Sequence, residues 1–284
     1  MYAVTGASGQ LGGLVLEALL AKVKADQVVA LVRDPAKVAD LAERGVNVRA
    51  FHYSRRETLV PALGGVGRLL LISSSEVGKR EAQHRAVIDA AKAAGVRFLA
   101  YTSILHADRN PLDLAVEHRA TEAEIVASGI SYAFLRNGWY TENYTMSAGA
   151  EVEHGSVIGS AGDGRISAAP RGDYAEAAAV VLTGEIDGAK TYELAGDDGF
   201  TLAQYAATLS LVSEKPVTYV NMPEAEFRGA LEGMGVPAPW PVILAESSAK
   251  SADGALFDDG AALSALIGRP TTSLKESVEQ ALAG

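Results

Sequence analysis

Short apolar runs alternate with longer amphipathic segments along the first half of the chain. The short runs are apolar on both faces, as parallel strands must be when helices cover both sides of a sheet. They lie at 2–5, 28–32, 46–51, 68–73, 96–103 and 131–136. Helical patterns fill the intervals between them, at 10–23, 80–95 and 115–129 among others. The alternation predicts an α/β fold, a Rossmann-type doubly wound parallel sheet.

The regular alternation ends near residue 137, and the remainder reads as a smaller α/β part. Strand patterns recur at 191–196 and 217–222. Two of the later helices open with capping boxes, Thr201 with Gln204 and Ser273 with Glu276. We therefore predict a Rossmann domain over residues 1–139. A smaller substrate-covering region is predicted over 140–284, contributing in part to the Rossmann sheet.

Three glycines follow the first predicted strand at the spacing Gly6-x-x-Gly9-x-x-Gly12, and a helical pattern begins at once. In this context Gly6 permits a tight turn and Gly9 lets the backbone approach a pyrophosphate. Gly12 lets the helix pack closely against the strand, and the helix N-terminus attracts anions. The alternative is that the glycines merely end the strand. The location after the first strand favours a dinucleotide site.

The residues after the second predicted strand indicate which dinucleotide binds. A carboxylate at this position takes the ribose hydroxyls of NAD, whereas a basic residue accommodates the 2′-phosphate of NADP. Arg33 stands here, and its planar guanidinium suits a phosphate. Asp34 precedes Pro35, which favours a helix N-cap over a ribose contact. Lys37 either adds charge to the site or is plain surface. The pattern favours NADPH.

The composition of the chain limits which kinds of binding partner and chemistry are expected. The net charge of −10 disfavours nucleic acid. The absence of cysteine excludes disulfides and thiolate chemistry, and it suits a reducing cytoplasm. No apolar run reaches the roughly 18–20 residues of a membrane span, and no signal peptide fits before the first strand. The five histidines form no ligand spacing, so no metal is expected. The oligomeric state stays open, with a homodimer as one option.

Several segments together resemble the NmrA-like atypical short-chain dehydrogenases, and within them the bacterial type 2 NAD(P)H:quinone oxidoreductases. They include TGASGQLG, LVRDPAK, LLLISSSEVGKREAQH, YTSILHAD and LRNGWYTENY, and the likeness runs along essentially the whole chain. The resemblance implies NADPH binding in the N-terminal part, a quinone site in the cleft and no flavin. One departure is His52 before Tyr53, where the family usually has Asp. It leaves the role of this loop open.

The resemblance also assigns the cofactor contacts residue by residue. It implies pyrophosphate contacts from Gly6, Ala7, Ser8, Gly9, Gln10 and Leu11, and a 2′-phosphate contact from Arg33. It implies that the nicotinamide end is lined by Ser73, Ser74, Ser75, Asn137, Gly138, Trp139 and Tyr140. The three serines could equally be a polar loop. The alternative for the two aromatic side chains is packing in the core.

The catalytic residues are less clearly marked. The helix predicted at 115–129 lacks the Tyr-x-x-x-Lys pair with which ketone-reducing short-chain dehydrogenases move a proton. His118 on this helix is the candidate donor, with Glu122 one turn on to orient its imidazole. The alternative is a surface histidine paired with Glu122. Asn137 is the second catalytic candidate, as a hydrogen-bond partner for a carboxamide or quinone oxygen.

These features predict an oxidoreductase that reduces quinones by two electrons, with direct hydride transfer from NADPH. An electron-poor acceptor needs orientation and a dry pocket more than an acid. One alternative is an NmrA-type redox sensor that binds NADP(H) without turnover. The other is a dye or carbonyl reductase on the same scaffold.

Overall fold

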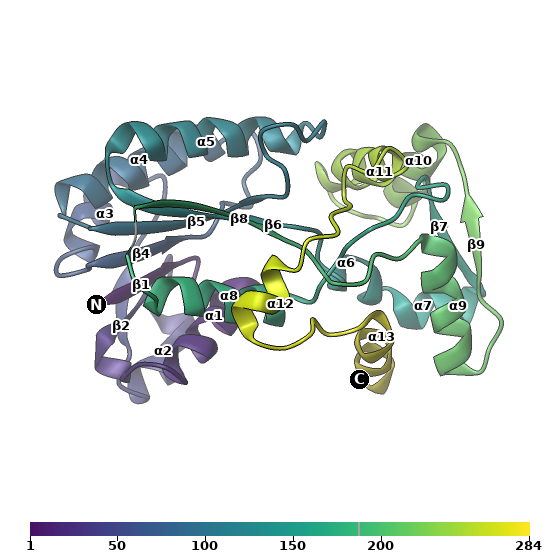
Figure 1. Ribbon diagram of the computed structural model, residues 1–284, viewed down its shortest axis with the longest axis horizontal. Coiled ribbons are helices and arrows are strands. Elements are labelled where there is room, and N and C mark those ends of the chain that lie inside the picture. The colour runs from purple at the N-terminus through teal and green to yellow at the C-terminus, as the bar shows by residue number, and fades with distance from the viewer. Residues whose placement is uncertain (187) are drawn as a thin grey trace. The chain divides into compact units, whose positions relative to one another are not determined.

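The computed structural model describes residues 1–186 and 188–284 (Figure 1). The chain forms two compact units. Unit 1 comprises Met1–Ala107, Val116–Asn137 and Arg171–Tyr192, and unit 2 comprises Asp108–Ala115, Gly138–Pro170 and Glu193–Gly284. The boundary near residue 137 is where the sequence rhythm changes. The segment from Arg171 to Tyr192 returns to unit 1 and supplies a helix and most of a strand.

Unit 1 is built on a seven-stranded sheet in the order β3-β2-β1-β4-β5-β6-β8. Its strands are β1 (Tyr2–Thr5), β2 (Val28–Val32), β3 (Asn47–Ala50), β4 (Arg68–Leu71), β5 (Phe98–Ile104), β6 (Ser131–Asn137) and β8 (Ala189–Leu194). The pairings from β3 through β6 are all parallel. The order reverses at β1, which is the switch point of a doubly wound sheet. The predicted Rossmann-type fold is confirmed.

Helices cover both faces of this sheet. In Figure 1, α3, α4 and α5 lie on one face and α1, α2 and α8 on the other. Their bounds are α1 (Gln10–Leu20), α2 (Ala39–Glu43), α3 (Arg56–Ala62), α4 (Arg80–Ala93), α5 (Leu114–Ser128) and α8 (Arg171–Thr183). Two 3₁₀ turns, η1 (Ala25–Gln27) and η2 (Pro35–Val38), flank β2.

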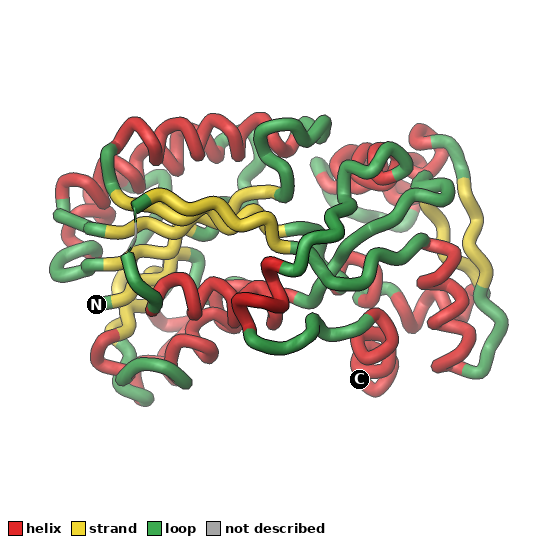
Figure 2. Tube along the Cα trace, in the orientation of Figure 1, coloured by secondary structure: helices red, strands yellow, loops and turns green. Residues whose placement is uncertain are grey.

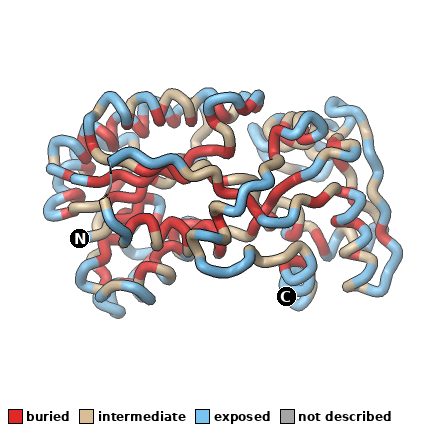
Figure 3. The backbone as a smooth tube through the Cα atoms, in the orientation of Figure 1, coloured by how far each residue is buried: buried red, intermediate tan, exposed pale blue. Residues whose placement is uncertain are grey.

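Buried apolar residues on both faces of the central strands form the core of unit 1, and Figure 3 shows the buried stretches in red. Leu69 and Leu71 of β4 belong to the cluster under α3, α4 and α5, whereas Leu70 between them points to the opposite face. All three are fully buried. Exposing three buried leucine side chains to water would cost several kcal/mol of hydrophobic stabilisation, so β4 is firmly held in the sheet. The carboxyl ends of β1 and β4 are therefore held as fixed supports for the loops that follow.

Unit 2 has a small parallel sheet of two strands and mainly short helices (Figure 2). The strands are β7 (Ser156–Gly159) and β9 (Thr218–Asn221). The helices are α6 (Glu142–Thr145), α7 (Ala148–His154), α9 (Leu202–Ser213), α10 (Glu224–Gly233), α11 (Trp240–Ser251), α12 (Ala262–Ile267) and α13 (Leu274–Ala283). Both predicted capping boxes are present and begin α9 and α13.

Candidate cofactor-binding site

The glycine turn (Gly6–Gly12) joins β1 to α1 and needs glycine for three different reasons. Gly6 has a φ of +59°, a left-handed conformation that costs other residues strain. Gly9 donates its N–H to Gly6 O at 2.9 Å, which closes the turn. A Cβ at Gly12 would lie 2.2 Å from Gly6 O, so any side chain there would collide with the turn. A Cβ at Gly9 would lie 3.2 Å from the same oxygen, a contact that small shifts relieve.

The N-terminus of α1 can attract an anion. Gly9 caps the helix without a side chain, and the first turn carries no acidic residue. The first N–H groups of a helix have no acceptor within it, and the helix dipole places partial positive charge there. The turn after Gly9 thus leaves backbone donors for a phosphate.

A cleft of about 680 Å³ lies over the glycine turn. Its volume is in the range of small-molecule sites. It is lined by Gly6, Ser8, Gly9, Gln10, Leu11, Gly12, Leu31, Arg33, Lys37, Phe51, His52, Tyr53, Ile72, Ser73, Ser74, Ser75 and Glu76. All of these residues belong to unit 1. The structure therefore brings the glycine turn, the residue after β2 and the three serines after β4 to one surface.

Some predicted site residues lie away from this cleft. Ala7 is 1% exposed, and its N–H donates to Leu31 O at 3.3 Å, so it supports the turn from behind. Asn137 ends β6, and the residues Gly138–Tyr140 belong to unit 2. In unit 2 they run beside Ala169, with Trp139 O accepting the Ala169 N–H at 3.2 Å. Their predicted contact with the nicotinamide end stays a prediction.

The charges at the β2 end of the cleft are basic. Arg33 and Lys37 both line it. Asp34 is the N-cap of η2, where its carboxylate accepts the Ala36 N–H at 3.1 Å. The carboxylate that could have bound ribose hydroxyls is thus engaged in the cap. A phosphate fits this end better than a pair of hydroxyls.

The loop after β3 contributes residues whose role the sequence left open. His52 and Tyr53 both line the cleft. The Tyr53 hydroxyl lies 2.7 Å from Thr5 Oγ1 and 2.7 Å from Ile72 O, and burial raises its pKa well above the usual value. Tyr53 thus ties the ends of β1 and β4 together. The sequence marked this position only through a family departure at its neighbour.

Asn137 is buried at the end of β6, with 5% of its surface exposed. Within the described residues its side-chain Oδ1 has no hydrogen-bond partner. A buried amide oxygen without a donor costs stability, and native proteins keep such atoms chiefly where a ligand or water completes them. The observation fits a residue that accepts a hydrogen bond from a bound amide.

His118 does not occupy the position expected of a proton donor. It is 4% exposed, so the alternative interpretation as a surface residue is also wrong. Its Nε2 lies 3.3 Å from Arg80 Nη1, and its Nδ1 lies 2.8 Å from the Tyr101 hydroxyl. An arginine can only donate, so Nε2 must accept and the imidazole is neutral. Burial, then the charge of Arg80, hold the His118 pKa well below its usual value.

Glu122 does not orient His118. Its carboxylate pairs with Arg136 at 2.8 Å and accepts the Ser103 hydroxyl hydrogen at 2.6 Å. All three side chains are mostly buried, and Glu122 thus joins α5 to β6 through Arg136 and to β5 through Ser103. The i,i+4 spacing correctly placed Glu122 near His118 along the helix. The sequence did not indicate that Arg136 on β6 is the ion-pair partner of Glu122.

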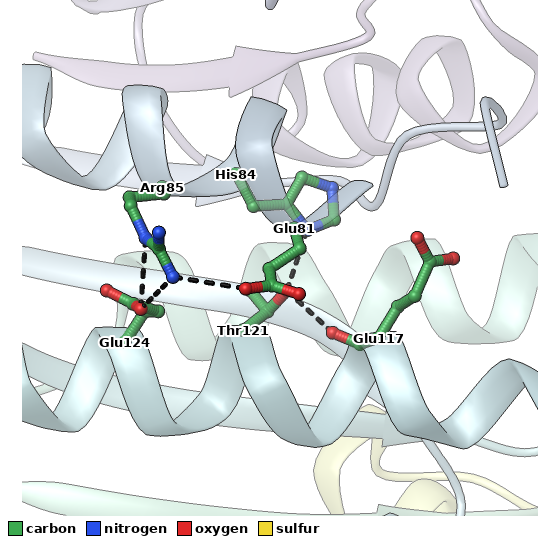
Figure 4. A network of polar contacts seen from close by, with 6 residues as sticks. All are labelled: Glu81, His84, Arg85, Glu117, Thr121 and Glu124. Carbon is green, nitrogen blue, oxygen red and sulfur yellow. Dashed lines mark hydrogen bonds and ion pairs between the residues drawn. The ribbon is translucent and has the colours of Figure 1, made fainter. Parts of the chain in front are cut away.

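His84 is a second buried histidine, and α4 and α5 meet around it (Figure 4). Its Nδ1 lies 2.9 Å from Thr121 Oγ1, whose hydroxyl donates to Glu117 O at 2.9 Å. Nearby, Arg85 of α4 pairs with Glu81 on its own helix and with Glu124 of α5. Desolvation by burial, followed by the charge of Arg80, lowers the His84 pKa to about 3.

This lowered pKa predicts acid-dependent stability. The groups facing His84 are Arg80, Tyr53, Tyr101, Thr121 and the Ser74 N–H, which include a positive charge and no negative one, and the Ser74 N–H needs an unprotonated Nε2. Between its ordinary pKa of 6.5 and about 3, the unfolded chain binds more protons than the folded one. The His84 contribution therefore falls by about 1.4 kcal/mol for each pH unit below 6.5. Denaturant unfolding at several pH values between about 3 and 6.5 should show that the free energy of unfolding falls more steeply with decreasing pH for the wild type than for His84→Gln. The exposed His154→Gln variant should keep the wild-type slope, and equal slopes in all three proteins would contradict the prediction.

Neither a metal cluster nor a membrane span is found in the described part of the chain. No group of three or more His, Cys, Asp or Glu side chains there is placed to hold a metal ion. No helix there is long and apolar enough to cross a membrane.

The fold and the cleft define a dinucleotide-binding Rossmann protein. A family model for NAD(P)H-binding proteins matches residues 6–184, more than half of the chain. The chain belongs to this NAD(P)H-binding family.

Individual relatives are similar over the whole chain. Quinone oxidoreductase 2 of Escherichia coli (strain K12) is 55% identical over 278 residues, which cover 98% of this chain and 97% of that protein. The crystal structure of an NADPH-dependent quinone oxidoreductase from Escherichia coli, complexed with NADPH, matches with a TM-score of 0.97 at 55% identity, covering 99% of this chain and 100% of that one. Citrobacter sp. triphenylmethane reductase, complexed with NADP(H), matches with a TM-score of 0.95 at 39% identity, covering 99% and 100%. The resemblance identified from the sequence motifs is confirmed.

Proposed function

We propose that this protein reduces quinones by two electrons with NADPH as the hydride donor and without flavin. The observation that carries the proposal is the cleft over the glycine turn. It combines phosphate-binding backbone donors with two basic side chains, in a chain similar along its length to an NADPH-dependent quinone oxidoreductase. The nicotinamide, when bound, supplies a hydride to the electron-poor ring.

The chain's own residues bind and orient rather than exchange protons. The glycine turn, including Gln10 and Leu11 at the start of α1, holds the pyrophosphate, and Arg33 holds the 2′-phosphate. The serine loop (Ser73–Ser75) also lines the cleft, after β4, which lies on the other side of β1 from β2. Asn137 offers its unpartnered Oδ1 to an amide N–H of the bound cofactor. Orientation of this kind lowers the barrier because it removes the entropy cost of bringing reactants together.

The residues Gly138–Tyr140 are proposed to border the quinone. Trp139 and Tyr140 are half-buried, so part of each residue is exposed. A parallel bridge between Tyr140 and Ala169 holds this stretch extended. Aromatic rings contact a flat apolar ligand over a large area at little cost in side-chain entropy. The reduced quinone takes its proton from water in this mechanism.

The test is steady NADPH consumption by the purified protein with quinones, without added flavin. The acceptor panel should also contain a triphenylmethane dye, because of the similarity to the Citrobacter reductase, and a simple ketone. Faster turnover with a quinone than with the other acceptors supports the proposal. Tight NADPH binding with no turnover on any acceptor would indicate a redox sensor instead.

Removing the acid–base capacity of His118 is predicted to have little effect on quinone reduction. Gln in its place keeps an oxygen that can accept from Arg80 but cannot act as an acid. General acid catalysis contributes about 10²–10⁴-fold where a step depends on it. We expect the kcat of His118→Gln to stay within about tenfold of the wild type from pH 5.5 to 8.5. A hundredfold loss, with disappearance of an acidic limb in the pH profile, would make His118 the donor and favour carbonyl substrates.

A further inference from the structure

The serine loop has no regular hydrogen-bonded structure, although it borders the cofactor cleft. Backbone groups in such a position must find other partners, and those partners then determine the path of the loop. The Ile72 N–H, just before the loop, donates to Thr5 Oγ1 of β1 at 2.9 Å. The Ser73 N–H donates to Thr102 Oγ1 of β5 at 2.9 Å. Side chains from the two flanking strands thus take the place of backbone acceptors for these N–H groups.

At Ser74 the partners of the loop backbone are side chains of helix α4. It is 5% exposed, and its N–H donates to His84 Nε2 at 2.9 Å. Its carbonyl accepts from Arg80 Nε. Both backbone groups of one buried loop residue are therefore held by side chains one helical turn apart on α4. Arg80 and His84 are themselves buried, with 6% and 0% of their surfaces exposed.

The protonation state of His84 follows from its partners. Nε2 accepts the Ser74 N–H, so Nδ1 carries the hydrogen and donates to Thr121 Oγ1. The Thr121 hydroxyl in turn donates a hydrogen bond to Glu117 O (Figure 4). Each donor in this series of hydrogen bonds has one acceptor, so the imidazole is fixed in one tautomer and one orientation. An imidazole held in this way is a rigid support for the Ser74 N–H.

Arg80 is held in a similar way. Its Nη1 contacts His118 Nε2 at 3.3 Å, and the other nitrogen of His118 contacts the Tyr101 hydroxyl at 2.8 Å. The two buried histidines therefore belong to one polar network between α4, α5 and β5. The network ends at the backbone of Ser74, on the cleft.

We propose that His84 and Arg80 are positioning residues that set the serine loop for the nicotinamide half of the cofactor, acting through the backbone of Ser74. This inference rests on the proposed use of NADPH. The sheet order places β2, with Arg33 after it, and β4, with the serine loop after it, on opposite sides of β1. The two halves of the dinucleotide thus meet different residues. Loss of the Ser74 support affects the half that lies over β4.

The experiment compares two ligands on the same variants by calorimetry. NADPH reports on the whole site, and 2′,5′-ADP reports on the adenosine and 2′-phosphate end alone. His84→Leu leaves the Ser74 N–H without its acceptor, and we expect its Kd for NADPH to rise by about tenfold. Its Kd for 2′,5′-ADP should stay within about twofold, because Arg33 and the glycine turn are untouched. His84→Gln, which offers an amide oxygen in place of Nε2, should recover most of the NADPH affinity.

Arg85→Ala is the matched control. Arg85 follows His84 on α4 and also reaches α5, through Glu124 at 2.6 Å, but it does not contact the serine loop. It should bind both ligands as the wild type does. Equal losses for NADPH and 2′,5′-ADP in His84→Leu, or the same NADPH loss in Arg85→Ala, would overturn the proposal in favour of general helix packing.

Arg80→Lys provides a second test that does not depend on the folding of His84→Leu. It keeps the buried charge but loses the fork that joins the Ser74 carbonyl to His118, so it should weaken NADPH selectively by about three- to tenfold. Unchanged NADPH affinity in a folded Arg80→Lys protein would also overturn the proposal. A wild type that binds 2′,5′-ADP and NADPH but reduces no quinone would contradict the proposed function and leave the positioning role intact.

Discussion

Gly9→Val is expected to abolish measurable NADPH binding in a protein that still folds. The backbone at Gly9 is extended, with a φ of −85°, so valine meets no left-handed strain there. Its Cβ would lie 3.2 Å from Gly6 O, which small shifts relieve. The branched side chain would nevertheless stand in the cleft at the start of α1, where a phosphate must approach the backbone donors. We expect the Kd for NADPH to rise by roughly 100-fold or more.

Gly13→Val is the matched control for this result. Gly13 lies one helical turn further along α1, and a Cβ there meets no atom within 4 Å. Gly9 is the N-cap of α1 and Gly13 lies in its first turns, so both variants place a β-branched side chain near the start of the same helix. Calorimetry with NADPH and thermal unfolding of both proteins separate the effects. Tight NADPH binding by folded Gly9→Val, or equal loss in both variants, would show that Gly9 does not face the pyrophosphate.

The strands of unit 1 could be predicted because their physical signal is local. Most are short runs that are apolar on both faces, whereas β3 and β8 also carry polar, partly exposed residues, and the observed bounds differ from the predicted ones by about two residues or fewer. The short elements of unit 2 carried a weaker signal. Helix α6 has four residues and α12 has six, too few for an amphipathic repeat to be recognised. The pairing of β7 with β9 joins segments about 60 residues apart, which no local pattern encodes.

The site residues that could be predicted follow strand ends directly. Arg33 and the serine loop fall in the cleft because the carboxyl ends of parallel strands share one edge of the sheet. The network behind the loop was not predicted, since its members lie on α4 and α5. Helix α5 buries His118, Thr121 and Glu122 while leaving Val116 and Val126 more than half exposed. Its packed face mixes these polar residues with apolar ones such as Ile125, so the hydrophobic pattern is weak, and a buried polar face resembles a solvated one in the sequence.

Arg33→Ala is expected to convert a protein that prefers NADPH into one that binds both nicotinamide cofactors alike. Arg33 is exposed at the edge of the cleft and follows β2, so its guanidinium can meet the 2′-phosphate without first leaving a buried site. A charge-assisted hydrogen bond to a phosphate contributes about 1.5–3 kcal/mol. The Kd for NADPH should therefore rise by roughly 10- to 150-fold. NADH lacks the 2′-phosphate and should bind nearly as before.

Two controls separate a specific contact from a general loss of positive charge. Arg56→Ala removes the same charge from an exposed residue at the start of α3 that does not line the cleft. It should leave both affinities unchanged if long-range attraction is small at physiological salt. Asp34→Ala tests the rival ribose contact. Because the Asp34 carboxylate already caps η2, this variant should lose stability by about 1 kcal/mol without losing NADH affinity selectively. Equal weakening of NADPH and NADH by Arg33→Ala would remove the phosphate assignment and leave Lys37 as the remaining basic group at this end of the cleft.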